Sequence, residues 1–260
     1  NTNTEEFAGL LFNLGAAATT PSASGNINPS AQWVNNTAGF SISKYTGTGG
    51  TSTLTIGHGL SKAPGWVLCK RIDNTGDWET NQYPGTTANK RFHFNSNDLP
   101  WTSNGGYIDG SNATSTVVQF TKGDNIDSVN TSGAEYIMYC FAEVPGVSCI
   151  GKYSIASNGN TTYSHTEREW IPCGFKPSAL LIRSLDGSQP WLLYHKQNQS
   201  HDVEVLLPAE TGYSTWGQRA MALTSFGFRF AYKQAASNEY GHTYQYVAFA
   251  ETPFKLARGS

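Results

Sequence analysis

Residues 64–78 read PGWVLCKRIDNTGDW, and residues 177–191 read PSALLIRSLDGSQPW. The two stretches align without a gap: each opens on a proline and an apolar run, and each ends with a basic residue, an Asp and a Trp. An apolar run bounded by turn-forming residues is typical of a buried strand that leads through a turn into the next strand. Self-similarity at this separation predicts two copies of one unit.

The sequence around these stretches repeats as well. Residues 136–145 (YIMYCFAEVP) match residues 244–253 (YQYVAFAETP), and Lys44-Tyr45 matches Lys152-Tyr153 at the same offset. The offset between residues 64–78 and 177–191 differs by a few residues, as a loop insertion would produce. We therefore place the first copy at 38–145 and the second at 146–255. An N-terminal segment (1–37) precedes them and a C-terminal tail (256–260) follows.

Composition and periodicity favour an all-β fold. Charged residues make up 14% of the chain, well below the roughly 25% of an average soluble protein, and Thr, Ser, Asn, Gly and aromatic residues suit short strands joined by tight turns. Apolar residues alternate with other residues around Leu54 and Ile56 and again from Phe226 to Tyr232, which predicts half-buried strands. Residues 136–142 are apolar at both parities, which indicates a central strand covered on both faces.

Only Pro145-Gly146 joins the two copies, so they have no linker between them. We therefore expect two tandem homologous β-sandwich-like units packed together. Ahead of them we expect a short helix and then an extended connector over residues 16–37. A capping box at Asn3–Glu6 precedes the apolar residues Phe7, Leu10, Leu11 and Leu14, which share one helical face. Because so short a helix is marginal in water, this face must dock on the first copy, on a symmetry mate or on an upstream domain.

Several classes of function are disfavoured. A net charge of −2 gives no basic surplus for binding nucleic acid, and the longest apolar runs have the length of a strand, which argues against a membrane span. The four cysteines form no C-x-x-C pair and no zinc-like spacing with histidine. We expect no metal, no cofactor and four unpaired thiols.

Two acidic features could carry chemistry. Residues 73–77 (DNTGD) could form a loop of oxygen ligands for Ca²⁺, but the matching residues 186–190 (DGSQP) keep the turn and lose the second carboxylate. A hairpin turn is therefore the favoured interpretation. Glu143 and Glu251 are repeat-equivalent, so we expect them to share one structural role in separate units rather than to form a catalytic pair. The sequence accordingly predicts a protein that is not an enzyme.

Aromatic residues provide the one compositional sign of a binding surface. Trp78 and Trp191 are repeat-equivalent and Trp66 lies in an apolar run, so these three are assigned to the core. Loop-like stretches without a counterpart in the other copy hold the candidate ligand-binding residues, which are Trp101, Tyr107, Tyr213 and Trp216. Aromatic rings stack on the apolar faces of sugars, and loops on a rigid scaffold concentrate binding residues. Replacing Trp101 or Trp216 with Ala should weaken attachment while leaving stability intact.

Five segments together resemble a repeat domain found near the C-termini of tail-fibre-like virion proteins of marine tailed phages, cyanophages included. They are residues 39–50, 56–78, 136–146, 173–186 and 246–255, and the resemblance extends through both copies. At the junction, residues 146–151 (GVSCIG) depart slightly from the pattern of that domain. The resemblance supplies no catalytic residues.

The resemblance implies a non-enzymatic bacteriophage virion protein located in the tail fibre or on the particle surface. Its expected role is that of a tail-fibre or receptor-binding component for host attachment. The implied partners are other virion proteins, a host-surface glycan or protein receptor, and further copies of the chain in a homo-oligomer, for which a trimer would be usual in a fibre. Two alternatives remain open: a capsid-associated or other structural virion protein, and the carbohydrate-binding part of a secreted bacterial protein.

Overall fold

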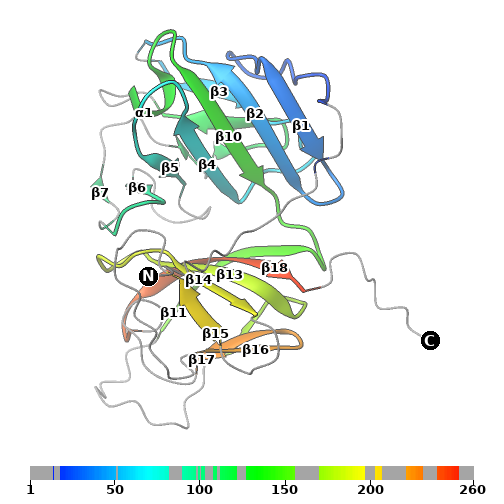
Figure 1. Cartoon of the computed structure of the whole chain (residues 1–260), viewed down its shortest axis with the longest axis vertical. Helices are drawn as coiled ribbons and strands as arrows, with labels where there is room; N and C mark the ends of the chain where they lie inside the picture. The colour runs from blue at the N-terminus through cyan, green and yellow to red at the C-terminus, as the bar shows by residue number, and fades with distance from the viewer. Residues whose placement is uncertain are drawn as a thin grey trace, which may run out of the picture.

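The computed structural model shows two β units, one above the other, that succeed each other along the chain (Figure 1). The structure describes residues 14, 18–50, 52–81, 90–97, 99, 101–102, 108–109, 112–121, 127–155, 170–196, 203–206, 221–230 and 239–251. Every sheet is antiparallel within this part of the chain. The predicted all-β fold of two packed, sandwich-like units is confirmed.

The first unit contains two sheets in its described residues. The larger has the strand order β1-β2-β10-β4-β5-β6-β7, with β1 (Ala31–Asn35), β2 (Phe40–Thr46), β10 (Glu135–Phe141), β4 (Trp66–Arg71), β5 (Trp78–Thr80), β6 (Lys90–His93) and β7 (Trp101–Thr102). The smaller has the order β3-β9-β8, with β3 (Leu54–Gly57), β9 (Val117–Phe120) and β8 (Ile108–Asp109). A one-turn helix, α1 (Asp127–Asn130), lies against β4.

The second unit is built in the same way from its described residues. One sheet has the order β11-β18-β13-β14-β15, with β11 (Ser148–Ser154), β18 (Thr243–Ala250), β13 (Pro177–Ser184), β14 (Leu192–Lys196) and β15 (Val203–Leu206). The other has the order β12-β17-β16, with β12 (Trp170–Pro172), β17 (Gly227–Phe230) and β16 (Met221–Thr224).

The two units share strand order and register. The order β2-β10-β4-β5-β6 in the first corresponds to β11-β18-β13-β14-β15 in the second, and β3-β9-β8 corresponds to β12-β17-β16. Tyr45 pairs with Tyr136 in the first unit as Tyr153 pairs with Tyr244 in the second. Because a one-residue slip would turn every side chain to the other face, a shared register means that equivalent residues face equivalent surroundings within each unit.

Each unit encloses its own core between its two sheets, and both cores contain the same stacked pair of tyrosines. The rings of Tyr45 and Tyr136 have centroids 5.1 Å apart, and those of Tyr153 and Tyr244 are 5.2 Å apart. A loop amide five residues upstream donates to the hydroxyl of the second tyrosine of each pair. Thr131 N lies 2.9 Å from Tyr136 Oη, and Glu239 N lies 2.8 Å from Tyr244 Oη. The buried hydroxyls are thereby satisfied, as burial of a polar group requires.

A third apolar cluster joins the two units. Its buried members come from both copies: Phe40, Trp66, Leu68 and Phe141 from the first, and Ile150, Leu181, Trp191 and Val247 from the second. Polar contacts also cross the boundary: Arg183 Nη1 donates to Ser96 O at 2.8 Å, and Gln245 Nε2 donates to Asn81 O at 3.3 Å. The two units therefore pack against each other through an interface of buried, apolar side chains.

The segment expected to be an extended connector is tied to the first unit. β1 lies within it and pairs with β2 along its whole length, and Thr19 bridges to Gln32. The buried amide of Gln32 donates to Ser43 Oγ at 2.9 Å and Gly57 O at 3.0 Å, and it accepts from Ser22 N at 3.0 Å. The predicted N-terminal helix falls on residues outside the described part of the chain, apart from Leu14 at its end.

Most strand predictions hold, with one correction. Leu54 and Ile56 lie on β3, and residues 136–141 form β10, which is central in its sheet between β2 and β4. Phe228 and Phe230 are buried on β17 as their alternation predicted. Phe226, however, lies in the turn before β17 and is exposed, because the chain reverses direction there to form a hairpin with β16.

Candidate binding surfaces

Two large aromatic side chains lie exposed next to each other on the second unit. Trp170 on β12 is 50% exposed and Phe226, in the turn between β16 and β17, is 52% exposed. Their ring centroids are 6.0 Å apart and their planes are inclined by 31°. We call this pair the aromatic platform. Single exposed apolar residues are ordinary on protein surfaces, but two large adjacent rings indicate a contact surface.

Backbone pairing in the small sheet fixes the aromatic platform. Trp170 lies opposite Arg229, and Ile171 lies opposite Phe228. Since side chains alternate along a strand, burial of Phe228 in the core turns Trp170 and Arg229 outward together. The carbonyl oxygen of Phe226 accepts from the amides of Cys173 and Gly174, at 2.9 and 3.2 Å.

Two polar side chains lie on the face of the sheet that carries the rings. The indole Nε1 of Trp170 donates to Thr224 Oγ1 at 3.3 Å, which holds the ring plane relative to β16. Arg229 is exposed on the same face of the sheet. Large apolar rings bordered by a hydroxyl and a guanidinium are the combination that can stack on a sugar face while hydrogen-bonding its oxygen atoms.

Among its described residues, the first unit has no such aromatic pair at the equivalent place. Thr55 pairs with Gln119 there, where Trp170 pairs with Arg229 in the second unit. The carbonyl of Thr116 accepts from the His58 amide, as the carbonyl of Phe226 accepts from the Cys173 amide. Threonines thus stand where the second unit has Trp and Phe. The aromatic platform is not required by the shared fold, because the first unit forms the same sheet without it.

A second apolar surface is a cavity of about 640 Å³ at the boundary between the units. Asn95 is its one polar lining residue among those described; the others are Leu14, Phe40, Ile42, Trp66, Leu68, Trp78, Phe94, Tyr139, Phe141, Leu181 and Leu193. We call it the inter-unit cleft. Its floor is the buried cluster that joins the units, while Trp78, Phe94 and Tyr139 are half-buried at its walls.

The sequence-predicted binding residues are not assembled within the described part of the chain. Trp101 lies on β7 with Arg91 as its backbone partner, and its side chain is outside the described residues. Tyr107, Tyr213 and Trp216 also lie outside them. Trp66 and Trp191 are buried as predicted, at 2% and 0% exposure, whereas Trp78 is only half-buried.

Sequence reasoning missed Trp170 and Phe226. Phe226 was assigned to a strand because it continues the alternation of Phe228 and Phe230. A signal was nevertheless present, since Trp170 and Phe226 are aromatic where the other copy has Thr55 and Thr116. Recognising those counterparts required knowing how β12 pairs with β17. In this region the two copies share little sequence.

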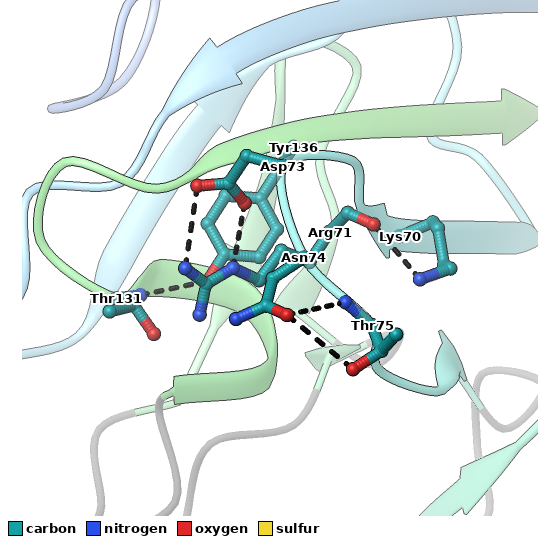
Figure 2. Close-up of polar contacts among 7 residues, drawn as sticks. All are labelled: Lys70, Arg71, Asp73, Asn74, Thr75, Thr131 and Tyr136. Atoms are coloured by element: carbon teal, nitrogen blue, oxygen red, sulfur yellow. Dashed lines mark hydrogen bonds and ion pairs between the residues drawn. The ribbon is translucent and has the colours of Figure 1, made fainter.

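The acidic loop forms a tight turn with internal contacts (Figure 2). Arg71 Nε contacts Asp73 Oδ1 at 2.7 Å and Arg71 Nη2 contacts Oδ2 at 3.3 Å, while Asn74 Oδ1 accepts from Thr75 N at 2.8 Å. Hydrogen bonding to Arg71 lowers the pKa of Asp73. In the second unit, Asp186 accepts from the Thr243 amide at 2.6 Å. Asp73 is engaged by Arg71 of its own turn and Asp186 by the Thr243 amide on β18, which favours the hairpin interpretation.

Other titratable groups form pairs in the described residues, such as His93 Nε2 with Glu79 Oε1 at 3.0 Å. Glu251 forms an ion pair with Lys176 at 2.8 Å, and Glu143 lies exposed at the matching place in the first unit. No group of three or more His, Cys, Asp or Glu residues that could hold a metal ion occurs in the part of the chain that the structure describes. Among the same residues, no helix is long and apolar enough to cross a membrane.

The four cysteines are free and occupy two different environments. Burial raises the pKa of Cys69 to about 12 and also raises the pKa of Cys140. Cys149 is half-buried on β11, and its pKa is lowered by a hydrogen bond with Cys173 and, to a smaller extent, by one with Tyr246, whose Oη lies 3.4 Å from Cys149 Sγ. The Cys149 thiol should therefore be more reactive than the buried thiols of Cys69 and Cys140.

The fold and these surfaces define a duplicated all-β protein with an exposed aromatic pair on one copy and an apolar cleft between the copies. The chain belongs to the family of the domain of unknown function DUF7483, which matches residues 1–253. No curated protein and no solved structure matches the chain.

Proposed function

We propose that the chain is a non-enzymatic virion protein of a tailed bacteriophage, a tail-fibre or receptor-binding component whose aromatic platform contacts a host-surface glycan. The observation that carries the proposal is the pair Trp170 and Phe226, exposed on the second unit and replaced by threonines in the first. The resemblance of both copies to a repeat domain of marine phage virion proteins supports the setting on the particle surface.

The physical argument begins with the cost of exposure. Burying a large apolar side chain stabilises a protein by about 1.5–3 kcal/mol relative to leaving it in water. Trp170 and Phe226 leave part of this stabilisation unrealised, although the first unit has threonine at both equivalent positions. A contact with another molecule best explains the two exposed rings. A glycan suits the aromatic platform because Thr224 and Arg229 are placed beside the rings to meet hydroxyl or carboxylate groups.

Attachment through one aromatic platform would be weak, and the expected homo-oligomer would compensate for this. In a trimeric fibre tip, three copies would engage one cell surface, and linked sites bind far more tightly than one because the later contacts are intramolecular. The other predicted partners, virion proteins that hold the chain on the particle, would then need surfaces away from β12 and β17.

Trp170→Ala and Phe226→Ala test this function. An interface aromatic that contributes about 2 kcal/mol corresponds to a roughly 30-fold loss of affinity on truncation. We expect a loss of this order in binding of the fluorescently labelled protein to an array of bacterial surface polysaccharides. The thermal midpoint should stay near that of the unaltered protein because both rings are exposed.

Ile72→Ala is the matched control, since Ile72 is 45% exposed on the first unit and should not affect glycan binding. If the unaltered protein binds no polysaccharide, or if Trp170→Ala and Ile72→Ala bind equally well, the platform is not the receptor site. The structural virion role would then be preferred. The candidates Trp101 and Trp216 belong in the same panel of alanine variants.

A further inference from the structure

Arg229 lies on β17, the middle strand of the small sheet in the second unit, and its side chain is exposed. Its chain neighbours Phe228 and Phe230 are both buried, so strand alternation turns Arg229 toward solvent. Its backbone partners are Trp170 on β12 and Ala222 on β16. The guanidinium therefore has an indole on one side and a single methyl group on the other, which leaves it accessible to a ligand beside the aromatic platform.

The charge of Arg229 is available for a contact with another molecule. Among the residues that the structure describes, no carboxylate forms an ion pair with Arg229, whereas Arg71 contacts Asp73 at 2.7 Å. A guanidinium remains protonated throughout the physiological pH range, and its planar set of donors matches the two oxygen atoms of a carboxylate. A carboxylate is therefore the group that best complements this part of the surface.

The comparison between the two copies shows that the positive charge accompanies the rings. At the places equivalent to Trp170, Arg229 and Phe226, the first unit has Thr55, Gln119 and Thr116. The second unit thus has a guanidinium where the first has a neutral amide, directly opposite the added indole. Because the first unit forms the same sheet without these three side chains, the fold does not require them. Their occurrence together on one face favours a ligand that combines a ring with a negative charge.

We propose that the aromatic platform and Arg229 together select acidic glycans, whose sugars carry carboxylates as uronic acids do, an inference that rests on the proposed glycan-binding function. The sugar ring stacks on Trp170 and Phe226, and its carboxylate accepts hydrogen bonds from the Arg229 guanidinium. Thr224 Oγ1 accepts from Trp170 Nε1 at 3.3 Å, so its own proton can be donated to a sugar hydroxyl. The rings thus supply contact area, and Arg229 supplies the preference for an acidic sugar over a neutral one.

The test uses the full chain and an array of bacterial surface polysaccharides, in which each uronate-containing member is also present with its carboxyl groups reduced to hydroxyls. We expect the unaltered protein to bind uronate-containing members about tenfold or more tightly than their reduced forms, as the loss of a hydrogen bond to a charged group predicts. Arg229→Gln should bind the acidic members as weakly as the unaltered protein binds the reduced ones. Arg229→Lys keeps the charge but loses the planar donors, and should have an intermediate affinity.

Lys62→Gln is the matched control, because it removes an exposed positive charge from the first unit and should leave binding unchanged. An equal loss of binding in Lys62→Gln and Arg229→Gln would overturn the proposal in favour of unspecific attraction between charges. Equal binding of acidic and reduced polysaccharides, with Arg229→Gln unaffected and Trp170→Ala impaired, would overturn the acidic class and leave the glycan-binding function standing. If no polysaccharide binds in either form, both the acidic class and the glycan-binding function are overturned.

Discussion

Trp191→Ala is the substitution whose effect on stability follows most directly from the structure. The Trp191 side chain is fully buried where the two units meet, with its ring centroid 5.9 Å from that of Trp66 and 5.4 Å from that of Phe94. Both neighbours belong to the first unit, whereas Trp191 belongs to the second. Removing the indole therefore empties part of the shared interface rather than part of either separate core.

The magnitude can be estimated from burial. A Trp side chain removes up to about 250 Å² from water, which at about 25 cal/mol per Å² corresponds to an upper value of about 6 kcal/mol. Alanine keeps part of that area and the unfolded chain is not fully extended, so the observed range of about 3–5 kcal/mol for Trp→Ala in a core is the better expectation. In a protein of this size, each kcal/mol lowers the midpoint by roughly 2–4 °C.

We therefore expect the thermal midpoint of Trp191→Ala, measured by calorimetry, to fall by roughly 6–20 °C. Trp170→Ala is the matched control, because it removes the same side chain from a position that is 50% exposed, and it should melt close to the unaltered protein. If the midpoints of the two variants differ by less than about 3 °C, well under the shift that burial predicts, the inter-unit interface does not have the packing described here.

Two further predictions test local features. At neutral pH, Ellman's reagent should react first with Cys149, because hydrogen bonding lowers the pKa of that thiol while burial raises the pKa of Cys69 to about 12. Cys149→Ser should abolish this fast phase of the reaction. Persistence of the fast phase in that variant would contradict its assignment to Cys149. Gly227→Ala should lower the free energy of unfolding by about 1–3 kcal/mol in urea titrations, because its Cβ would clash with the carbonyl oxygen of Ile171 on the paired strand. Gly76→Ala, where a Cβ meets nothing within 4 Å, should stay within about 0.5 kcal/mol of the unaltered protein, and similar losses for both variants would refute this account of the β12–β17 pairing.

The duplication and the all-β class followed from the amino-acid sequence alone. The aligned stretches at 64–78 and 177–191 became β4 and β13, each leading through a turn to the next strand, and residues 136–141 became the central strand β10. These inferences succeeded because strand periodicity and turn chemistry are local properties, and because the anchors of the two copies share one spacing. Reliance on local pattern also explains the wrong strand assignment of Phe226, because the alternation of apolar residues in the sequence continues past the point where the chain turns.

How deeply a side chain is buried where the two units meet depends on their tertiary packing. Trp78 and Trp191 are repeat-equivalent. Trp78 lies opposite Lys70, and Trp191 immediately precedes Leu192, which lies opposite Ile182. Yet Trp191 is fully buried and Trp78 is half-buried at the wall of the inter-unit cleft. The repeat fixes what each residue meets inside its own unit, but the two units do not present identical surfaces to each other. Whether an outward-facing ring is covered therefore depends on contacts between residues far apart in sequence, which no local pattern encodes.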